Sequence, residues 1–532
     1  MKHRSRLLPY FALTVAGGSD SAQRPDWDAL GRRWWSHVRI LADDRMEGRE
    51  TGSPGFERAA DYVMEQFRAA GLRPAGTSGF RQPMDFRVTQ IDQARSSVEL
   101  IRGGRTDPLA LGEDAVVAVS SQTAATAEAE AVFVGYGLTI PHLDYDDLAG
   151  HDVRGKIVVF VRGGPAVIPG PVRAHYQSQE ERSRALKRAG ALGWVGIPNP
   201  KVPELPWSRM AEGLLLPRME LRDPGPEVFA PLPVTILFNP ERAEKLFAGS
   251  GHTFQEMVTQ LGSEVSLPRF PLAAKIRVRV AFARREARCQ NVVGVFPGSD
   301  PVLKDQYVVL SAHLDHLGIG PAANDRPIYR GAMDNASGVA SLLEVARALH
   351  ESATRPRRSI LFLAVTGEEK GLLGSQYFAT HPTVTGSLVA NINLDMFLPL
   401  FALKYLEVEG LEESSLGNDI RAVAGLRGVE THVEYEPDRV LFIRSDQYSL
   451  IKVGVPALSC SFGYVSGSAE EKRAKTWLSE RYHGPADGLD QPVDLPAAAQ
   501  FTDLLRALVT RVADADPRPT WNPYSFFRRF AQ

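Results

Sequence analysis

Residues 307–316 read YVVLSAHLDH, a short apolar strand pattern with metal-ligating residue types directly behind it. Residues 307–312 are apolar except for Ser311, as expected for a strand that is buried on both faces of a sheet. In open α/β sheets, ligands bind at the carboxyl ends of the strands. The stretch His313-Leu314-Asp315-His316 therefore marks a candidate binding edge.

The chain on either side continues this pattern. Strands that alternate with helices predict an α/β domain with a mostly parallel sheet covered by helices on both faces. Apolar residues recur at helical spacing in the segment 337–350. The expected elements are a helix over 54–70, strands over 291–296 and 307–312, a helix over 337–350, a strand over 360–365, a helix over 371–379 and a strand over 389–394.

The segment 129–271 has a different pattern from the rest of the chain. Strand patterns at 131–134, 156–161, 193–197 and 234–238 predict a compact β-rich module with its own core. The expected division is a leader over 1–22, the N-terminal part of the α/β domain over 24–128 with short strands near 88–111, an insert over 129–271, the rest of the α/β domain over 272–515, and an aromatic tail over 516–532 that packs on the domain.

Charge and cysteine content narrow the classes of function. The chain has 61 Lys and Arg against 63 Asp and Glu, a formal net charge of −2, which argues against a general nucleic-acid binder. Only Cys289 and Cys460 are present, so a cysteine-based zinc site and a disulfide framework are excluded, while one bridge between the two stays open. Any metal must be held by His, Asp and Glu.

The N-terminus has the features of an export signal. Basic residues precede an apolar run over 7–16, and small residues follow it, which predicts a signal peptide over 1–22 and a secreted or periplasmic protein. The alternative is an N-terminal extension without such a role. The run is shorter than the ~20 apolar residues that a bilayer-spanning helix needs, and we expect no membrane span elsewhere.

Further polar residues follow the other predicted strands. Each alone has an ordinary explanation, such as helix capping or a solvated surface, but their order along the chain favours one shared site. The residues are Asp334 in the glycine-bounded segment 331–338, Glu368 and Glu369 after the strand 360–365, Asp395 after the strand 389–394, and His483 in a downstream loop.

These residue types suit a pair of zinc ions. Zinc accepts imidazole nitrogen and carboxylate oxygen, and two zincs ~3.5–4 Å apart can share a bridging carboxylate. Asp334 sits in a tight turn and is the natural bridge. We expect His313 and Glu369 to complete one ion, and Asp395 and His483 to complete the other.

Two more residues acquire roles from this arrangement. Adjacent residues on an extended segment point in opposite directions, so Glu368 is left unligated beside Glu369 and is positioned as the general base. Asp315 lies two residues after His313, and we expect its carboxylate to accept the second ring N–H of that histidine.

The same motifs carry a family resemblance. His313-Leu314-Asp315, the segment 333–338, Gly367-Glu368-Glu369, Asn393-Leu394-Asp395 and the segment 482–487 resemble the co-catalytic di-zinc metallopeptidases, the family of secreted bacterial leucine-type aminopeptidases and glutamate carboxypeptidase. The insert at 129–271 resembles the protease-associated domain that many members carry. The resemblance covers roughly residues 35–510.

The resemblance implies a zinc-dependent exopeptidase, and first of all an aminopeptidase, that acts on a peptide or protein with a free N-terminus. It implies two Zn²⁺ bridged by Asp334, with Glu368 as general base and Asp315 as a supporting residue. One departure concerns the substrate pocket: Ser445-Asp446-Gln447 stands where the family has Ser-Asp-His, and Phe442 lacks a hydroxyl. Asp446 and Gln447 are the candidates for substrate contact.

Three alternatives stay open. A carboxypeptidase or dipeptidase would use the same scaffold and ligands, and a glutaminyl cyclase-like enzyme would use a single zinc. A non-catalytic binding protein would keep the insert and a vestigial site. A serine hydrolase is disfavoured because no GxSxG motif is present, and Gly135-Tyr136-Gly137 lacks the third glycine of a dinucleotide fingerprint.

Overall fold

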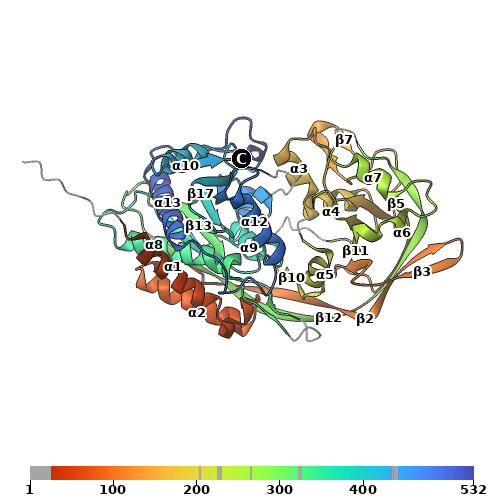
Figure 1. The fold of residues 1–532 in the computed structure, drawn as a ribbon, viewed down its shortest axis with the longest axis horizontal. Helices are drawn as coiled ribbons and strands as arrows, with labels where there is room; N and C mark the ends of the chain where they lie inside the picture. The colour runs from red at the N-terminus through yellow and green to blue at the C-terminus, as the bar shows by residue number, and fades with distance from the viewer. Residues whose placement is uncertain are drawn as a thin grey trace, which may run out of the picture.

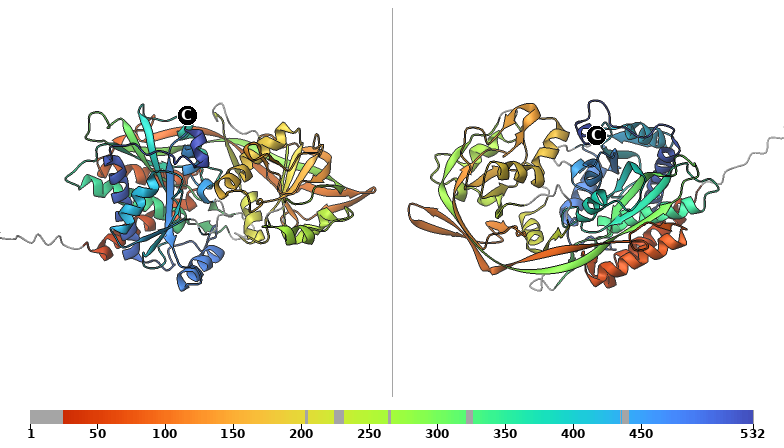
Figure 2. Two further views of the ribbon diagram at one scale, coloured as in Figure 1. Left: turned by 90° about the horizontal axis from the view of Figure 1, so that it is seen from above. Right: turned by 180° about the vertical axis from the view of Figure 1, so that it is seen from behind.

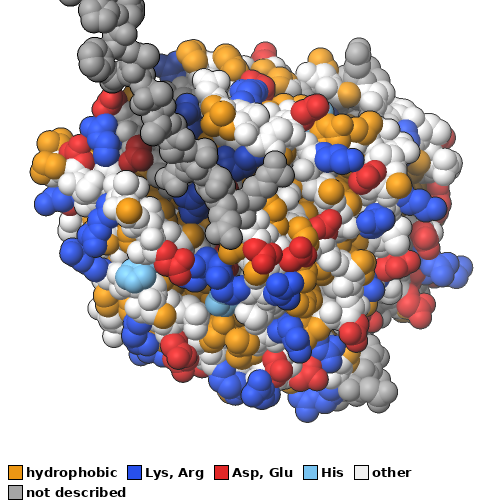
Figure 3. All heavy atoms as spheres, turned by 60° about the vertical axis from the view of Figure 1, so that its left-hand side comes forward, with side chains coloured by type: hydrophobic (Ala, Val, Ile, Leu, Met, Phe, Trp, Pro, Cys, Tyr) orange, Lys and Arg blue, Asp and Glu red, His pale blue; other side chains and the backbone are white. Residues whose placement is uncertain are grey.

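The computed structural model describes residues 25–202, 205–223, 231–263, 266–320, 326–433, 435 and 441–531. The predicted signal peptide over 1–22 lies outside the described residues. Among the helices that are described, none combines the length and apolarity of a membrane span. Figure 3 shows basic and acidic side chains interspersed over one face of the molecule.

The larger module is built on a mixed sheet that is mostly parallel, as predicted (Figure 1). Neighbours run parallel in the pairs β13–β16, β13–β17, β17–β20 and β18–β19, and antiparallel where β12 meets β16 and where β18 meets β20. In spatial order the strands are β19 (Glu430–His432), β18 (Tyr405–Glu409), β20 (Ala457–Gly463), β17 (Ser387–Leu394), β13 (Gln306–His313), β16 (Ser359–Val365) and β12 (Phe270–Phe296).

Helices cover both faces of this sheet, which is why its central strands are apolar on both sides. Val308 and Leu310 of β13 pack in the core formed with α8 and α13, whereas Val309 packs in a second core with residues of α9 and α11. The helices of this module are α1 (Trp27–Leu41), α2 (Pro54–Ala69), α8 (Ser337–His350), α9 (Leu373–Thr380), α10 (Leu416–Gly425), α11 (Gln447–Ile451), α12 (Ala469–Glu480) and α13 (Leu495–Asp514).

The register of the central strands brings their carboxyl ends to one edge. His313 of β13 lies opposite Val365 of β16, and Ala312 lies opposite Leu394 of β17. Residues that follow these three strands must therefore meet at the same edge of the sheet.

A long antiparallel ribbon joins the two modules (Figures 1 and 2). It consists of β2 (Arg81–Arg102) and the antiparallel partner β12, which continue from one module into the other. The prediction of short strands near 88–111 is therefore wrong for the first part of that segment. The two strands pair continuously, with one register shift between Arg279 and Ala281. This pairing satisfies the backbone of β2 along its length, so β2 forms one long strand and not several short ones.

The smaller module has its own hydrophobic core and a central set of parallel strands. Its core also takes in Ile91, Val98 and Val117, so it begins upstream of the expected boundary at residue 129. Its elements are β3 (Arg105–Leu109), β4 (Ala115–Val117), β5 (Thr126–Phe133), β8 (Ile157–Val161), α3 (Gly170–Gln177), α4 (Gln179–Arg188), β9 (Gly193–Ile197), α5 (Trp207–Leu215), β10 (Arg218–Leu221), β11 (Val234–Phe238), α6 (Glu244–Phe247) and α7 (Phe254–Gln260).

Two smaller features complete the fold. The aromatic tail packs on the protein, because Trp521 and Phe527 are buried in a cluster with Phe442. Cys289 and Cys460 are both buried and unbridged, so their pairing plays no part in the fold.

Candidate metal centre

The structure brings all five predicted metal ligands together at the carboxyl edge of the sheet. His313 ends β13, Asp395 directly follows β17, and Glu369 lies just beyond β16. Asp334 precedes α8, and His483 comes from the loop after α12. The turn before Asp334 needs a glycine: Gly331 has φ of +56°, and a Cβ there would collide with the Asp334 carbonyl oxygen.

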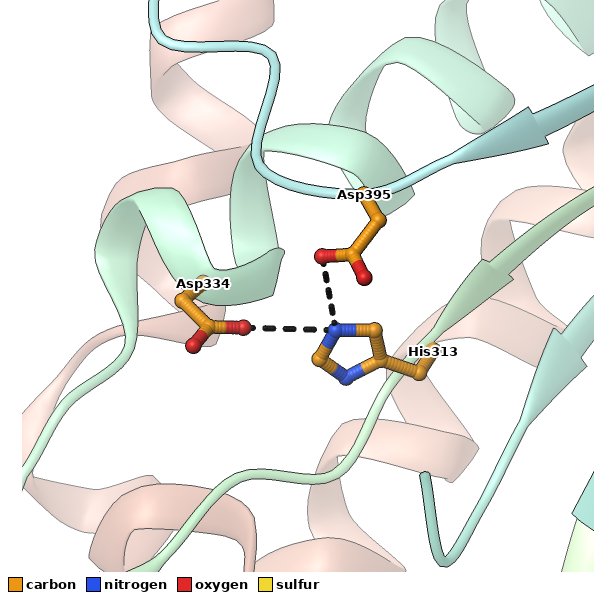
Figure 4. A group of neighbouring side chains, drawn as sticks. All are labelled: His313, Asp334 and Asp395. Carbon is orange, nitrogen blue, oxygen red and sulfur yellow. Dashed lines mark hydrogen bonds and ion pairs between the residues drawn. The ribbon is translucent and has the colours of Figure 1, made fainter. Parts of the chain in front are cut away.

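Asp334 lies between two histidines. Its Oδ1 is 3.2 Å from His313 Nε2, and its Oδ2 is 3.2 Å from His483 Nε2. In Figure 4, Asp334 and Asp395 point at the His313 ring from different segments. One carboxylate that offers one oxygen to each of two sites has the geometry of a bridging ligand.

The remaining ligands pair differently from the prediction. Asp395 Oδ1 lies 3.2 Å from His313 Nε2, and Glu369 Oε2 lies 3.2 Å from His483 Nε2. The expected pairing of His313 with Glu369, and of Asp395 with His483, is therefore wrong. The cause is the sheet register, which sets Asp395 directly beside the end of β13, whereas Glu369 lies four residues beyond β16.

The site is closed on one side and open on the other. The side chains of His313 and Asp334 are 1% and 4% exposed, whereas those of Asp395 and His483 are 24% and 26% exposed. A substrate could therefore approach from the Asp395 and His483 side. The burial of several carboxylates in one place calls for compensating positive charge.

The histidines and carboxylates polarise one another strongly. Burial alone would lower the pKa of His313, but the carboxylates of Asp395 and Asp334 outweigh it and hold that pKa well above its usual value. Burial would raise the pKa of Asp334, but His316, His313 and His483 hold it well below its usual range. Zinc binds neutral imidazole and ionised carboxylate, so binding of the metal would displace the histidine protons.

Asp315 supports the site by another route than predicted. Its backbone carbonyl, not its carboxylate, lies 3.1 Å from His313 Nδ1. The buried carboxylate instead accepts hydrogen bonds from Thr51 Oγ1 at 3.0 Å and from the Glu368 N–H at 3.2 Å. The chain after β13 turns so that the carbonyl faces the ring, which still fixes the tautomer of that histidine.

Glu368 has the environment of a proton carrier. Its burial, with the nearby charges of Asp395 and Glu369, raises the pKa of Glu368 well above its usual value, although His313 acts in the opposite direction. The residue as a whole keeps partial exposure to solvent. A carboxyl group of raised pKa beside an open site is suited to general acid–base work.

His316 joins the site although no role was predicted for it. Its Nδ1 lies 2.7 Å from Glu369 Oε1 and 3.9 Å from Asp334 Oδ2. Its Nε2 is buried and has no hydrogen-bond partner among the residues that the structure describes. The sequence signal was available, because His316 stands three residues after His313 in the same motif.

Two buried charged residues hold the loops that carry the ligands. Asp487 accepts the backbone N–H groups of Met333 at 2.9 Å and of Asp334 at 3.0 Å. Arg49 donates to the carbonyls of Leu314 at 2.8 Å and of Gly331 at 2.9 Å. Asp487 belongs to the segment 482–487 that the sequence singled out, but the contacts of both residues depend on loops that are far apart in the chain.

The two candidates for substrate contact lie beneath the site. The Gln447 amide is buried, accepts from Asn393 Nδ2 at 2.8 Å and donates to the Phe442 carbonyl at 3.2 Å, so it is a framework residue. Asp446 is fully buried, and burial raises its pKa to about 7. Its carboxylate oxygens make no hydrogen bond within the described part of the chain.

Comparison with known proteins identifies the proteins to which this chain is similar. Residues 291–509 match the model of Peptidase family M28. The chain is 42% identical over 110 residues, or 20% of its length, to a probable zinc metalloprotease of Pyrenophora teres f. teres, and 29% identical over 217 residues, or 37%, to a probable leucine aminopeptidase 2 of Aspergillus oryzae. These matches span only 22% and 40% of the two relatives.

A solved structure extends the likeness to the whole fold. The aminopeptidase from Aneurinibacillus sp. strain AM-1 superposes with a TM-score of 0.56 at 19% identity, covering 94% of this chain and 99% of that one. At this identity the match establishes the fold of both modules and no more. The candidate ligands all lie inside residues 291–509, the segment that is similar to Peptidase family M28.

Proposed function

We propose that the protein is a zinc-dependent aminopeptidase that hydrolyses the N-terminal peptide bond of a peptide or protein. The observation that carries the proposal is Asp334, whose two oxygens face His313 and His483 at equal distances of 3.2 Å. The family match and the names of the relatives support the same reading.

The donor set fits two zinc ions. His313, Asp334 and Asp395 would hold one ion. Asp334 and Glu369 would hold the other with His483, whose Nε2 lies 3.2 Å from both carboxylates, and His316 also lies within reach of these two carboxylates. When bound, zinc supplies Lewis acidity that lowers the pKa of water and polarises a carbonyl group.

The chain itself supplies the proton transfers. Glu368 takes a proton from the attacking water and delivers it to the leaving amine nitrogen, which a carboxyl group of raised pKa can do in both directions. Asp315 holds the Glu368 backbone in place, and the Asp315 carbonyl orients the His313 ring. The partly exposed side of the site, at Asp395 and His483, admits the substrate.

The other parts of the chain take supporting roles in this proposal. We assign the smaller module to the protease-associated type, because residues 129–271 resemble that type of domain. The superposition with the Aneurinibacillus aminopeptidase also includes this module. We also propose export, because a basic start and an apolar run over 7–16 precede the domain. The mass of the protein recovered outside the cytoplasm tests the proposed export. A mass that includes the N-terminal residues would contradict the signal peptide.

A panel of free and N-blocked aminoacyl substrates, combined with zinc analysis, tests the activity. The proposal predicts cleavage of substrates with a free α-amino group only, by protein that holds two zincs. Cleavage of N-blocked peptides from their C-terminus would instead establish a carboxypeptidase. Cyclisation of N-terminal glutamine by a single-zinc protein would establish the cyclase alternative.

A further inference from the structure

Helix α5 belongs to the smaller module, but its Arg209 side chain contacts the catalytic domain. Arg209 Nη1 donates to the Tyr482 carbonyl at 2.9 Å. Its Nη2 donates to the carbonyls of Ser479 at 2.6 Å and Glu480 at 3.2 Å. Figure 1 shows α5 at the junction of the two modules. One guanidinium thus binds three backbone carbonyls of the other module.

Those carbonyls lie where the chain leaves α12 and enters the ligand loop. Ser479 and Glu480 form the C-terminus of α12, where a cation is favourable for the helix dipole. The Tyr482 carbonyl belongs to the peptide bond that leads into His483. Arg209 therefore fixes both the end of the helix and the plane of the peptide next to a candidate ligand.

His483 needs such support because its backbone is strained. Its φ is +52°, in the left-handed region that a histidine seldom adopts. Conformations of this kind persist only where the surroundings hold them. Within the loop, Arg481 Nη1 donates to the Ala486 carbonyl at 2.6 Å, and the Gly484 N–H donates to the Arg481 carbonyl at 2.9 Å. These bonds stabilise the loop that contains His483, and Arg209 stabilises the peptide group that precedes it.

Arg209 is itself placed by the smaller module. Trp207 Nε1 donates to the Gly112 carbonyl at 2.8 Å, and Gln90 Nε2 donates to the Leu215 carbonyl at 2.8 Å, so both ends of α5 are tied to that module and its ribbon. A second contact region docks the modules: Glu180 of α4 pairs with Lys452 at 2.9 Å. The position of Arg209 relative to the ligand loop therefore depends on how the smaller module packs against the catalytic domain.

We propose that Arg209 is a positioning residue for His483, and that the smaller module thereby completes the metal position formed by His483, Glu369 and Asp334. The inference rests on the proposed zinc site. The position formed by His313 and Asp395 receives no contact from α5 among the described residues and is predicted to be independent of Arg209.

Zinc binding by the full-length chain tests the proposal. Competition with a chromogenic chelator gives the dissociation constants of the two zincs for the wild type, Arg209→Ala and Arg209→Lys. We expect the dissociation constant of the weaker-bound zinc to be about tenfold higher in Arg209→Ala than in the wild type. Removal of a residue that hydrogen-bonds near a metal ligand has an effect of this size in other metalloproteins. The other zinc should keep its affinity, and Arg209→Lys should recover part of the loss because it keeps one donor and the charge.

Matched variants separate positioning from general damage. Arg222→Ala removes a guanidinium of the same module that pairs with exposed Glu286 at 3.2 Å, and should bind both zincs as the wild type does. His483→Ala should reproduce the loss of the same zinc. Equal weakening of both zincs in Arg209→Ala, or wild-type affinity for both, would overturn the inference while the two-zinc site stands. A wild-type chain that binds no second zinc would contradict the proposed function and this inference with it.

Discussion

Glu368 and Glu369 are adjacent in the chain yet face different tasks. Glu369 Oε2 lies 3.2 Å from His483 Nε2, inside the metal centre, whereas Glu368 stands near His313 and Asp395 without a ligand position of its own. The two backbone N–H groups both donate to Asp315, at 3.2 Å and 3.4 Å. A single buried carboxylate thus fixes the turn that separates Glu368, the proposed base, from Glu369, the proposed ligand.

Replacing Glu368 with Gln should abolish proton transfer and leave the metal centre intact. General-base residues contribute roughly 10²- to 10⁴-fold to rate, so we expect kcat to fall by about 10³-fold while the zinc content is unchanged. Steady-state kinetics with parallel metal analysis measure both quantities. Turnover at the wild-type rate would remove Glu368 from the mechanism.

At the scale of elements, α8 links the metal centre to the rest of the domain. It begins three residues after Asp334, and Glu344 in its middle binds α1 through Arg33 at 2.9 Å and His37 at 3.2 Å. Burial would raise the pKa of Glu344, but His37, Arg347 and Arg33 lower it to about 2. This ion cluster holds α1 against the helix that follows Asp334.

Glu344→Gln should therefore destabilise the protein in a pH-dependent way. Because the folded pKa lies below the unfolded one, the ionised Glu344 stabilises the fold at neutral pH, and this contribution is lost as pH falls from about 4.5 toward 2. We expect a loss of about 2 kcal/mol at pH 7, a value reduced because Arg33 and Arg347 are partly exposed.

Denaturant midpoints at pH 7, 5 and 3.5 measure the difference between the wild type and Glu344→Gln. The difference in denaturant midpoint between the two proteins should be smallest at pH 3.5. Glu351→Gln, which removes an exposed partner of Arg347, is the control and should shift stability by less than about 0.5 kcal/mol. A gap that stays constant across pH would contradict the assigned role of the charge.

Elements also show what the sequence could predict. Local periodicity predicted the helix over 337–350 with the bounds that α8 has, and the apolar strands β13, β16 and β17 to within two residues. It did not predict the ribbon of β2 and β12, because that pairing joins segments far apart in the chain. The ligand pairing failed for the same reason: the ligand residue types are local, but their partners depend on strand order.

Across the whole molecule, the near-neutral charge conceals a concentrated acidic site. Asp315, Asp334, Glu368, Glu369 and Asp395 lie together at one edge of a sheet. The smaller module reaches this edge through Arg209 and docks elsewhere through the buried pair of His175 and Tyr448, whose side chains lie 2.6 Å apart. Both modules therefore contribute to the geometry of one centre.

The bridge at Asp334 is the central claim, and zinc stoichiometry tests it most directly. Elemental analysis of the purified full-length chain should give two zincs for the wild type. Asp334→Asn should lose both, because its amide cannot offer an anionic oxygen to each position, while Asp61→Asn, at an exposed surface pair with Arg81, should keep two. Two tightly bound zincs in Asp334→Asn, or a single zinc in the wild type, would contradict the account.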